Sequence, residues 1–186
     1  MDEGRPINIG RGEVFALFRT PTGFLWSARS TDDGMTWTGP SPTPLVHPDA
    51  PPMLFVLSDG KTLAAFHHNR ASRYDTLSAR AEMQKDRAEL WVALSRDGGR
   101  TWSQPRFVLA NALAPTTGNA WLDYQCSYID AFCDGGRLHI FMPHRWKRAL
   151  YLTLSEDALD KLPTKAELGQ PARPPAACRT AGTALY

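Results

Sequence analysis

Residues 30–37 read Ser30-Thr-Asp-Asp-Gly-Met-Thr-Trp37, and residues 95–102 read Ser95-Arg-Asp-Gly-Gly-Arg-Thr-Trp102. The two stretches share Ser, Asp, Gly, Thr and Trp at the same spacing and begin 65 residues apart. A third and incomplete copy, Ser-Glu-Asp-Ala, begins 60 residues later at Ser155. The chain therefore repeats one supersecondary unit, and a period of this length is typical of a unit that contains several strands.

Each copy follows a run of apolar and aromatic residues that has the composition of a β-strand. In the copy itself, a short Asp side chain can accept hydrogen bonds from the amides of its own turn, while Gly permits a positive φ. The Trp ring is large enough to cover the end of a sheet. The repeat therefore predicts a turn that closes a β-strand, which is a structural role.

Around these turns, the remaining strands can be placed by their apolar runs and their Gly and Asp-Gly boundaries. We predict an all-β protein with about three blades, each a four-stranded antiparallel sheet. The strands of the first blade are expected at 6–9, 14–19, 24–30 and near 45–46, those of the second at 53–57, 62–67, 89–95 and 106–110, and those of the third at 125–132, 137–142 and 148–155, without an obvious fourth.

Two segments lie outside this pattern. Residues 69–87 form a long polar insertion between strands of the second blade, which we expect to be a partly helical loop. Residues 161–186 are rich in Pro and Ala without a period, so we expect a flexible tail after a blade region at 1–160.

The overall composition indicates a globular domain with 42% hydrophobic residues, 22% charged residues and a net charge of +2. Basic residues are scattered among acidic ones, so we expect no nucleic-acid partner. No apolar stretch is long enough for a membrane span, so we expect no membrane partner either. Residues 1–6 show no secretory pattern, but this leaves the compartment open.

The cysteines and histidines do not predict a disulfide or a metal site. Cys126 and Cys133 fall on one predicted strand and would point to opposite faces, so we expect free thiols. His67 and His68 are adjacent on a strand and also face opposite ways. We therefore expect no metal and no cofactor.

The pattern Ser-x-Asp-x-Gly-x-Thr-Trp resembles the Asp-box, or BNR repeat, of the sialidase (neuraminidase) superfamily, and the resemblance covers about residues 3–158. It implies a partial six-bladed β-propeller that corresponds to the C-terminal half. Three blades leave sheet faces uncovered, so we expect self-association or a missing N-terminal half.

The resemblance also implies a site for a carboxylate-bearing sugar, such as sialic acid, because sialidases hold the carboxylate with arginines. A guanidinium matches a carboxylate bidentately and stays charged. Arg19, at the end of a predicted strand, and Arg87, just before another, are the substrate-binding candidates. Glu3, sixteen residues before Arg19, is the catalytic glutamate candidate.

The family nucleophile is a tyrosine, which avoids placing a carboxylate against an anionic substrate. At the corresponding place this chain has Cys126. Tyr124 lies two residues earlier and would face the same way by strand alternation, so it is the catalytic tyrosine candidate, and Tyr128 shares that parity. The first arginine and the acid/base aspartate of the family belong to N-terminal blades, and the repeat aspartates Asp32, Asp97 and Asp157 are not substitutes.

Two functions of different class stay open. In the first, the chain is the C-terminal part of a sialidase-like exo-glycoside hydrolase that acts on a carboxylate-bearing glycan. In the second, it is a non-catalytic Asp-box propeller that binds a glycan or a protein, as Cys126 at the nucleophile position suggests.

Overall fold

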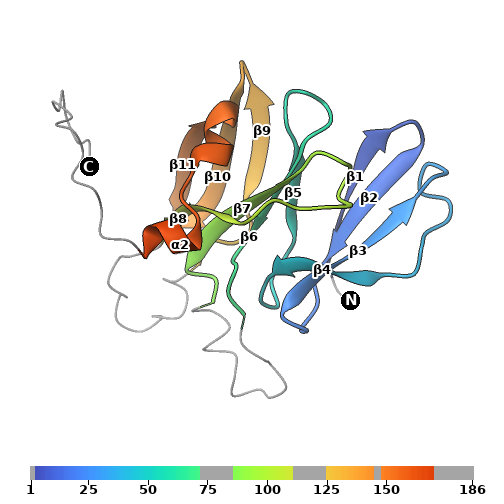
Figure 1. Ribbon diagram of the computed structural model, residues 1–186, viewed down its shortest axis with the longest axis horizontal. Coiled ribbons are helices and arrows are strands. Elements are labelled where there is room, and N and C mark those ends of the chain that lie inside the picture. The colour runs from blue at the N-terminus through green and yellow to red at the C-terminus, as the bar shows by residue number, and fades with distance from the viewer. Residues whose placement is uncertain (1–2, 72–85, 111–124, 145–147, 170–186) are drawn as a thin grey trace, which may run out of the picture.

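The protein is all-β, as the sequence predicts, with three antiparallel sheets that lie side by side (Figure 1). The computed structural model describes residues 3–71, 86–110, 125–144 and 148–169. The first sheet has the order β1-β2-β3-β4, the second β5-β6-β7-β8 and the third β11-β10-β9. The strands are β1 (Gly4–Gly10), β2 (Glu13–Phe18), β3 (Phe24–Ser30), β4 (Ser41–Val46), β5 (Met53–Val56), β6 (Leu63–His67), β7 (Glu89–Ser95), β8 (Arg106–Ala110), β9 (Asp130–Asp134), β10 (Arg137–His144) and β11 (Arg148–Ser155).

Most strands lie within one or two residues of their predicted bounds, and β4 and β9 differ more. β4 is longer than the expected short strand near 45–46, and it includes Pro42 and Pro44. An outermost strand tolerates proline because it has no neighbour on one side to receive its N–H groups. β9 begins at Asp130 rather than at residue 125, because Tyr128 has φ +58°, which interrupts an extended strand.

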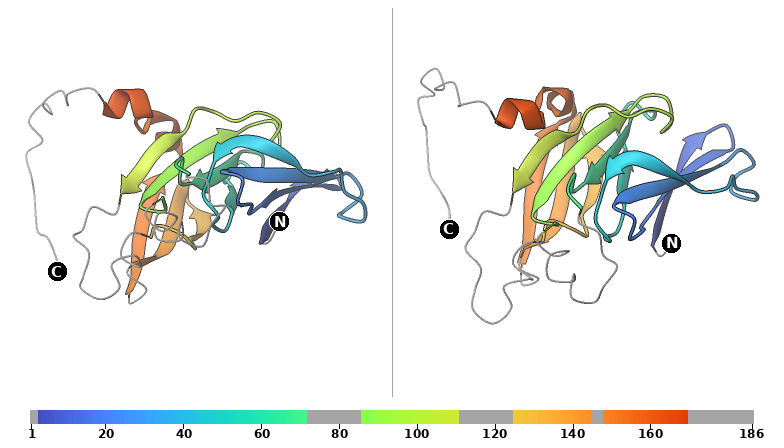
Figure 2. Two further views of the ribbon diagram at one scale, coloured as in Figure 1. Left: turned by 90° about the horizontal axis from the view of Figure 1, so that it is seen from below. Right: turned by 60° about the horizontal axis from the view of Figure 1, so that its bottom comes forward.

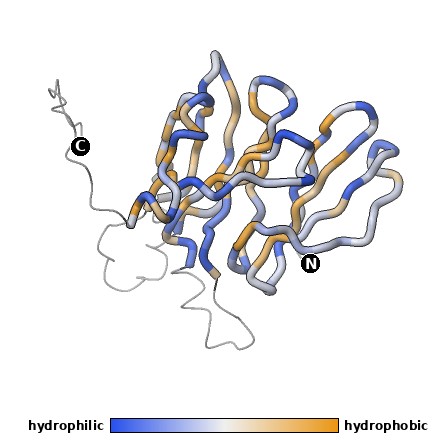
Figure 3. The backbone as a smooth tube through the Cα atoms, viewed as in Figure 1, coloured by the Kyte–Doolittle hydropathy of each residue, from blue (hydrophilic) through white to orange (hydrophobic). Residues whose placement is uncertain are grey.

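Alternate residues of each strand fill two cores between the sheets. Phe15 and Leu17 of the first sheet pack with Leu63 and Ala65 of the second. On the other face of the second sheet, Phe66 and its neighbours pack with the aliphatic side chains of the third, among them Leu138, Ile140, Leu152 and Leu154. Many residues of the strands are hydrophobic, and many turns at the strand ends are hydrophilic (Figure 3).

The first strands of the three sheets, β1, β5 and β9, lie next to one another. Arg5 of β1 lies over the ring of Phe55 in β5, 5.3 Å from its centroid, and approaches Asp130 of β9 to 3.5 Å. Residues of these three strands line an open groove of about 460 Å³. The sheets therefore radiate from a shared axis, which is the arrangement of propeller blades (Figure 2).

The third copy of the repeat does not form the repeat turn. Residues Glu156–Lys161 form the 3-10 helix η3, and Leu159 of this helix is fully buried in the second core. Gly34 and Gly99 stand four residues after the repeat serine with φ +88° and +83°. The third copy has Leu159 at that place, and a branched side chain disfavours this backbone region.

The first part of the segment that we expected to be a flexible tail contains a short helix. Helix α2 (Lys165–Leu168) follows η3, and Thr164 and Glu167 form a reciprocal capping box at its start. The backbone N–H of Phe107 donates to Pro163 O at 2.8 Å, so this segment is tied to β8. Local capping and this hydrogen bond outweigh the composition; residues 170–186 lie outside the described part.

Other predictions have mixed outcomes. Cys133 is a free thiol, as expected, and Cys126 precedes β9 rather than lying on it. The predicted partly helical insertion at 69–87 lies mostly outside the described residues. Within the described ranges, no helix is both long and apolar enough to cross a bilayer.

Candidate functional site

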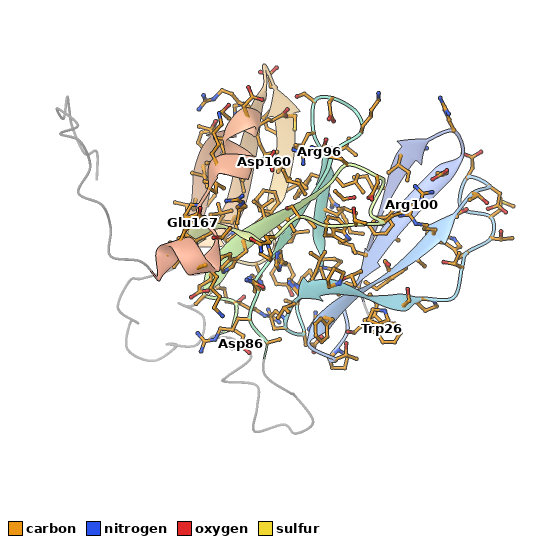
Figure 4. The ribbon with its side chains drawn as sticks, viewed as in Figure 1. Trp26, Asp86, Arg96, Arg100, Asp160 and Glu167 are labelled. Carbon is orange, nitrogen blue, oxygen red and sulfur yellow. The ribbon has the colours of Figure 1, made fainter. Side chains whose placement is uncertain are left out.

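The candidate site lies at the end of the sheets where their first strands begin. Glu3 directly precedes β1, and Asp49 lies between β4 and β5. Arg19 follows β2, which runs antiparallel to β1, so its end meets the start of β1. Arg87 lies two residues before β7, and Tyr128 lies two residues before β9. Asp86, the neighbour of Arg87, lies at this end in Figure 4, whereas Arg96, Arg100 and Asp160 lie toward the opposite end.

Arg19 is held by two carboxylates. Its Nη1 binds Glu3 Oε2 at 2.8 Å, and its Nε binds Asp49 Oδ1 at 2.5 Å. Its backbone N–H also donates to Glu3 O at 2.9 Å. Burial alone would lower the pKa of Arg19, but the hydrogen bonds to Asp49 and Glu3 overcome it and leave the pKa raised. The structure therefore brings together Arg19 and Glu3, two of the residues that the resemblance indicates.

Arg87 is more deeply buried than Arg19, with 3% of the residue exposed. Its Nη2 donates to the backbone oxygen of Asp49 at 2.5 Å, so Asp49 contacts both arginines. Burial lowers the pKa of Arg87, the nearby charge of Arg19 lowers it further, and a hydrogen bond with Tyr128 opposes the shift. Its buried Nε has no hydrogen bond within the described part of the chain.

The segment before β9 places a tyrosine, not the cysteine, at this site. Cys126 is buried in the second core, where its Sγ lies 3.4 Å from Ala88 O. Tyr128 is 43% exposed and contacts Arg87. Strand alternation predicted the same side for both residues, and that prediction is wrong because the segment is not extended at Tyr128. Tyr124 lies outside the described residues.

Buried histidines lie beneath the site and connect its loops. His47 and His68 stack with ring centroids 4.9 Å apart. The Nδ1 of His68 must donate to the carbonyl of Glu89, 2.8 Å away, so its Nε2 accepts from Ser127 Oγ at 3.0 Å. These contacts join the connections that carry Asp49 and Tyr128.

These histidines are neutral at neutral pH. Burial lowers the pKa of His67 to about 4 and that of His68 to about 3, and it also lowers the pKa of His47 well below its usual value. The described residues contain no group of three or more His, Cys, Asp or Glu side chains suited to a metal ion.

The repeat turns belong to the other end of the sheets. In the first, Asp32 accepts hydrogen bonds from the backbone N–H and the hydroxyl of Thr36, at 2.8 and 2.6 Å. In the second, Asp97 accepts the same two bonds from Thr101, at 2.9 and 2.6 Å. Hydrogen bonds lower the pKa of both carboxyl groups, that of Asp32 to about 2. Both carboxylates are therefore hydrogen-bonded within their own turns.

Sequence reasoning missed Asp49, which links the two arginines. A proline-rich connection gives no direct signal for a site residue. The repeat offers an indirect one, since Asp49 precedes the first strand of the second sheet as Glu3 precedes that of the first.

A profile of the BNR repeat-like domain family matches residues 5–140, which is most of the chain. The chain belongs to the BNR repeat-like domain family. The resemblance to the sialidase superfamily is thereby confirmed, together with the propeller-type fold. A comparison with curated proteins found no match.

Solved structures with this BNR-type fold include two sialidases. The NanB sialidase from Streptococcus pneumoniae is 18% identical, with a TM-score of 0.55 over 86% of this chain and 24% of that chain. The intramolecular trans-sialidase from Ruminococcus gnavus is 16% identical, with a TM-score of 0.55 over 86% of this chain and 34% of that chain. The BNR chain therefore spans about a quarter to a third of the length of these proteins, and the likeness shows the fold.

Proposed function

We propose that this BNR chain is the C-terminal part of a sialidase-like exo-glycoside hydrolase, and that Arg19 and Arg87 bind the carboxylate of sialic acid or a similar sugar. The observation that carries the proposal is the arginine pair. Two guanidinium groups from adjacent sheets meet at Asp49 at one end of the axis. Burial of Arg87 with an Nε that has no hydrogen bond among the described residues costs free energy. An anionic ligand that binds this arginine would offset that cost.

The two arginines have different environments and therefore different roles. Arg19 already binds two carboxylates, so it serves mainly to hold the site together. The Nε of Arg87 has no hydrogen bond among the described residues, and burial lowers the pKa of Arg87, so this residue gains more from an added negative charge. The related structures agree with an anionic ligand, since the S. pneumoniae enzyme is in complex with a substituted ethanesulfonate and the R. gnavus enzyme with oseltamivir carboxylate.

For turnover, we propose Tyr128 as the phenol nearest the bound sugar, with Tyr124 as the competing position. Tyr128 is partly exposed and contacts the arginine that would hold the carboxylate. Glu3 contacts Arg19, and we propose it as the base that assists the phenol. By resemblance, the acid/base aspartate and the first arginine come from further blades, so this chain alone should turn over substrate slowly.

The second candidate is a non-catalytic glycan-binding propeller. It is favoured by Cys126, which occupies the expected nucleophile position and packs into the core instead of the site. The same arginine pair would then bind the sugar without cleaving it.

Binding of N-acetylneuraminic acid, measured by calorimetry, tests the shared part of both functions. Arg87→Met should weaken binding by about tenfold to a hundredfold, because a charge-assisted hydrogen bond is worth about 1.5–3 kcal/mol. Arg96→Met at the opposite end should leave it unchanged, and the neutral sugar N-acetylmannosamine should bind to neither form. Equal affinity of the Arg87→Met and wild-type chains would refute the proposal.

A fluorogenic sialoside then separates the enzyme from the binding protein. Turnover that disappears in Tyr128→Phe and survives in Tyr124→Phe supports Tyr128 as nucleophile. Loss in Tyr124→Phe alone returns that role to Tyr124. Binding without turnover in the wild-type chain supports the non-catalytic function.

A further inference from the structure

Tyr128 faces the site from a backbone conformation that a tyrosine rarely adopts. Its φ is +58°, in the left-handed region, where the Cβ of an L-residue lies close to the following carbonyl oxygen. The residues on either side, Ser127 and Ile129, are buried, whereas Tyr128 is 43% exposed. A left-handed residue persists only where the surrounding structure holds it, and the buried neighbours of Tyr128 supply contacts that can do so.

The segment before Tyr128 is hydrogen-bonded to the segment that carries Arg87. The backbone N–H of Cys126 donates to Arg87 O at 2.7 Å. Ser127 is fully buried, and its hydroxyl lies 3.0 Å from Nε2 of His68, the residue that follows β6. A side-chain contact therefore fixes the chain one residue before Tyr128.

The positions of the protons in this contact follow from its neighbours. A backbone carbonyl can only accept, so Nδ1 of His68 carries the proton that it donates to Glu89 O, 2.8 Å away. Burial keeps the ring neutral, because it lowers the pKa of His68 to about 3. The Nε2 of a neutral ring is then an acceptor, and the Ser127 hydroxyl donates to it. His68 thus connects the start of β7, beside Arg87, to the segment of Tyr128.

A second buried histidine fixes the ring of His68. His47 stacks on it with ring centroids 4.9 Å apart, and the backbone N–H of His68 donates to Nδ1 of His47 at 3.3 Å. The Nε2 of His47 therefore carries the proton, which it donates to Pro51 O at 3.2 Å. Every ring nitrogen of the two histidines is hydrogen-bonded, so neither ring can rotate without breaking a bond.

We propose that Ser127 and His68 are positioning residues, which hold Tyr128 against Arg87 without touching the sugar themselves. Both are 0% exposed, so they act from beneath the site. Removal of the hydrogen bond between them would release Tyr128 from its left-handed conformation and from its contact with Arg87. This inference rests on the proposed function in that Tyr128 and Arg87 are the residues proposed to face the sugar.

A fluorine label tests the positioning without any sugar. In the chain labelled with 3-fluorotyrosine, the Tyr128 resonance is the one that Tyr128→Phe removes. Arg87→Met should shift this resonance, because the guanidinium contact is lost, and Ser127→Ala should shift it as well. If the Tyr128 resonance does not move in Ser127→Ala, the proposal is wrong.

A matched control shows whether any lost serine hydroxyl would have the same effect. Ser30 is also buried, and its hydroxyl donates to Asp32 at the opposite end of the sheets, at 2.6 Å. Ser30→Ala should therefore leave the Tyr128 resonance in place. A shift in this variant equal to that in Ser127→Ala would overturn the proposal, because it would show a general effect of lost stability.

Variants of His68 separate the hydrogen bond from packing. The amide of His68→Gln keeps an oxygen that can accept from Ser127 and an N–H that can donate to Glu89, so the Tyr128 resonance should stay near its wild-type position. His68→Leu fills a similar space without either group, and it should reproduce the shift seen in Ser127→Ala. Equal shifts in the Gln and Leu variants would contradict the proposed role of the hydrogen bond.

Sugar binding separates this inference from the proposed function. Ser127→Ala should weaken the binding of N-acetylneuraminic acid by about threefold to tenfold, the usual contribution of one neutral hydrogen bond. If the wild-type chain binds no sugar while the Tyr128 resonance responds as described, the proposed function fails and the positioning role stands. If both chains bind equally well and the resonance is unchanged, the positioning role fails and the proposed function stands.

Discussion

At the scale of single residues, the site depends on how charges are compensated. Asp49 uses a carboxylate oxygen for Arg19 and its backbone oxygen for Arg87, so one residue fixes two guanidinium groups from different sheets. A guanidinium left without such partners in the interior would cost several kcal/mol. Arg87 is buried and its Nε has no hydrogen bond within the described residues, which makes this residue the centre of the binding proposal.

The buried histidines make stability sensitive to acid. Their folded-state pKa values lie below the usual 6.5, at about 4 for His67 and about 3 for His68. Below pH 6.5 these histidines bind protons in the unfolded chain but stay neutral in the folded chain. The free energy of unfolding therefore falls as pH drops from 6.5 toward 4. Each histidine contributes at most about 1.4 kcal/mol per pH unit.

His68→Gln should therefore make the fall of melting temperature between pH 7 and pH 4.5 shallower, whatever its effect on stability at pH 7. His139→Gln, on the outer face of the third sheet, is the control and should leave the slope unchanged. If the slope is unchanged in His68→Gln, protonation of His68 does not cause the loss of stability at low pH.

At the scale of elements, the repeat turn of one sheet packs on the sheet before it. A Cβ added to Gly99 would lie 2.7 Å from the ring of Phe15, and Arg29 of the first sheet donates to Gly98 O. The glycine is thus required twice, by its φ of +83° and by the close approach of Phe15. The repeat turn joins neighbouring sheets as well as closing its own strand.

Gly99→Ala should lower the free energy of unfolding by about 2–4 kcal/mol, through backbone strain and overpacking against Phe15. Gly136→Ala is the matched control, because Gly136 has φ +73° and nothing within 4 Å of an added Cβ. Its cost should be about 1 kcal/mol. Equal costs in urea unfolding would exclude the Phe15 contact as a cause.

The strands themselves follow closely from sequence. β3, β7 and β8 have the predicted bounds, since apolar runs and Gly-containing turns define them locally. The start of β9 does not have its predicted position, because Tyr128 has a positive φ. A positive φ can be anticipated from sequence at glycine or asparagine but not at tyrosine. That single backbone angle decides which side chain faces the arginines.

At the scale of the whole molecule, the C-terminal part of the described chain closes one side of the second core. Leu159 of η3 is buried there, and Arg106 donates to Leu162 O at 2.8 Å. The segment that composition assigned to a tail therefore supports the second and third sheets together.

Truncation separates this segment from the remaining tail. Ending the chain after Lys161 removes the acceptors for Phe107 and Arg106 and should cost about 2–4 kcal/mol of unfolding free energy. Ending it after Gly169 should leave the melting temperature unchanged, if residues 170–186 form the flexible tail that their composition predicts. A large loss in the longer truncation would contradict that prediction.

The sequence by itself determined the repeated turn and the all-β architecture, because both depend on short-range patterns and on the spacing of the repeat. The resemblance to the sialidase superfamily indicated Arg19, Arg87 and Glu3 as site candidates. Only the tertiary structure showed that Asp49 links the two arginines and that Tyr128, not Cys126, contacts Arg87. Contacts between distant segments depend on how whole sheets pack, and local patterns do not encode that packing.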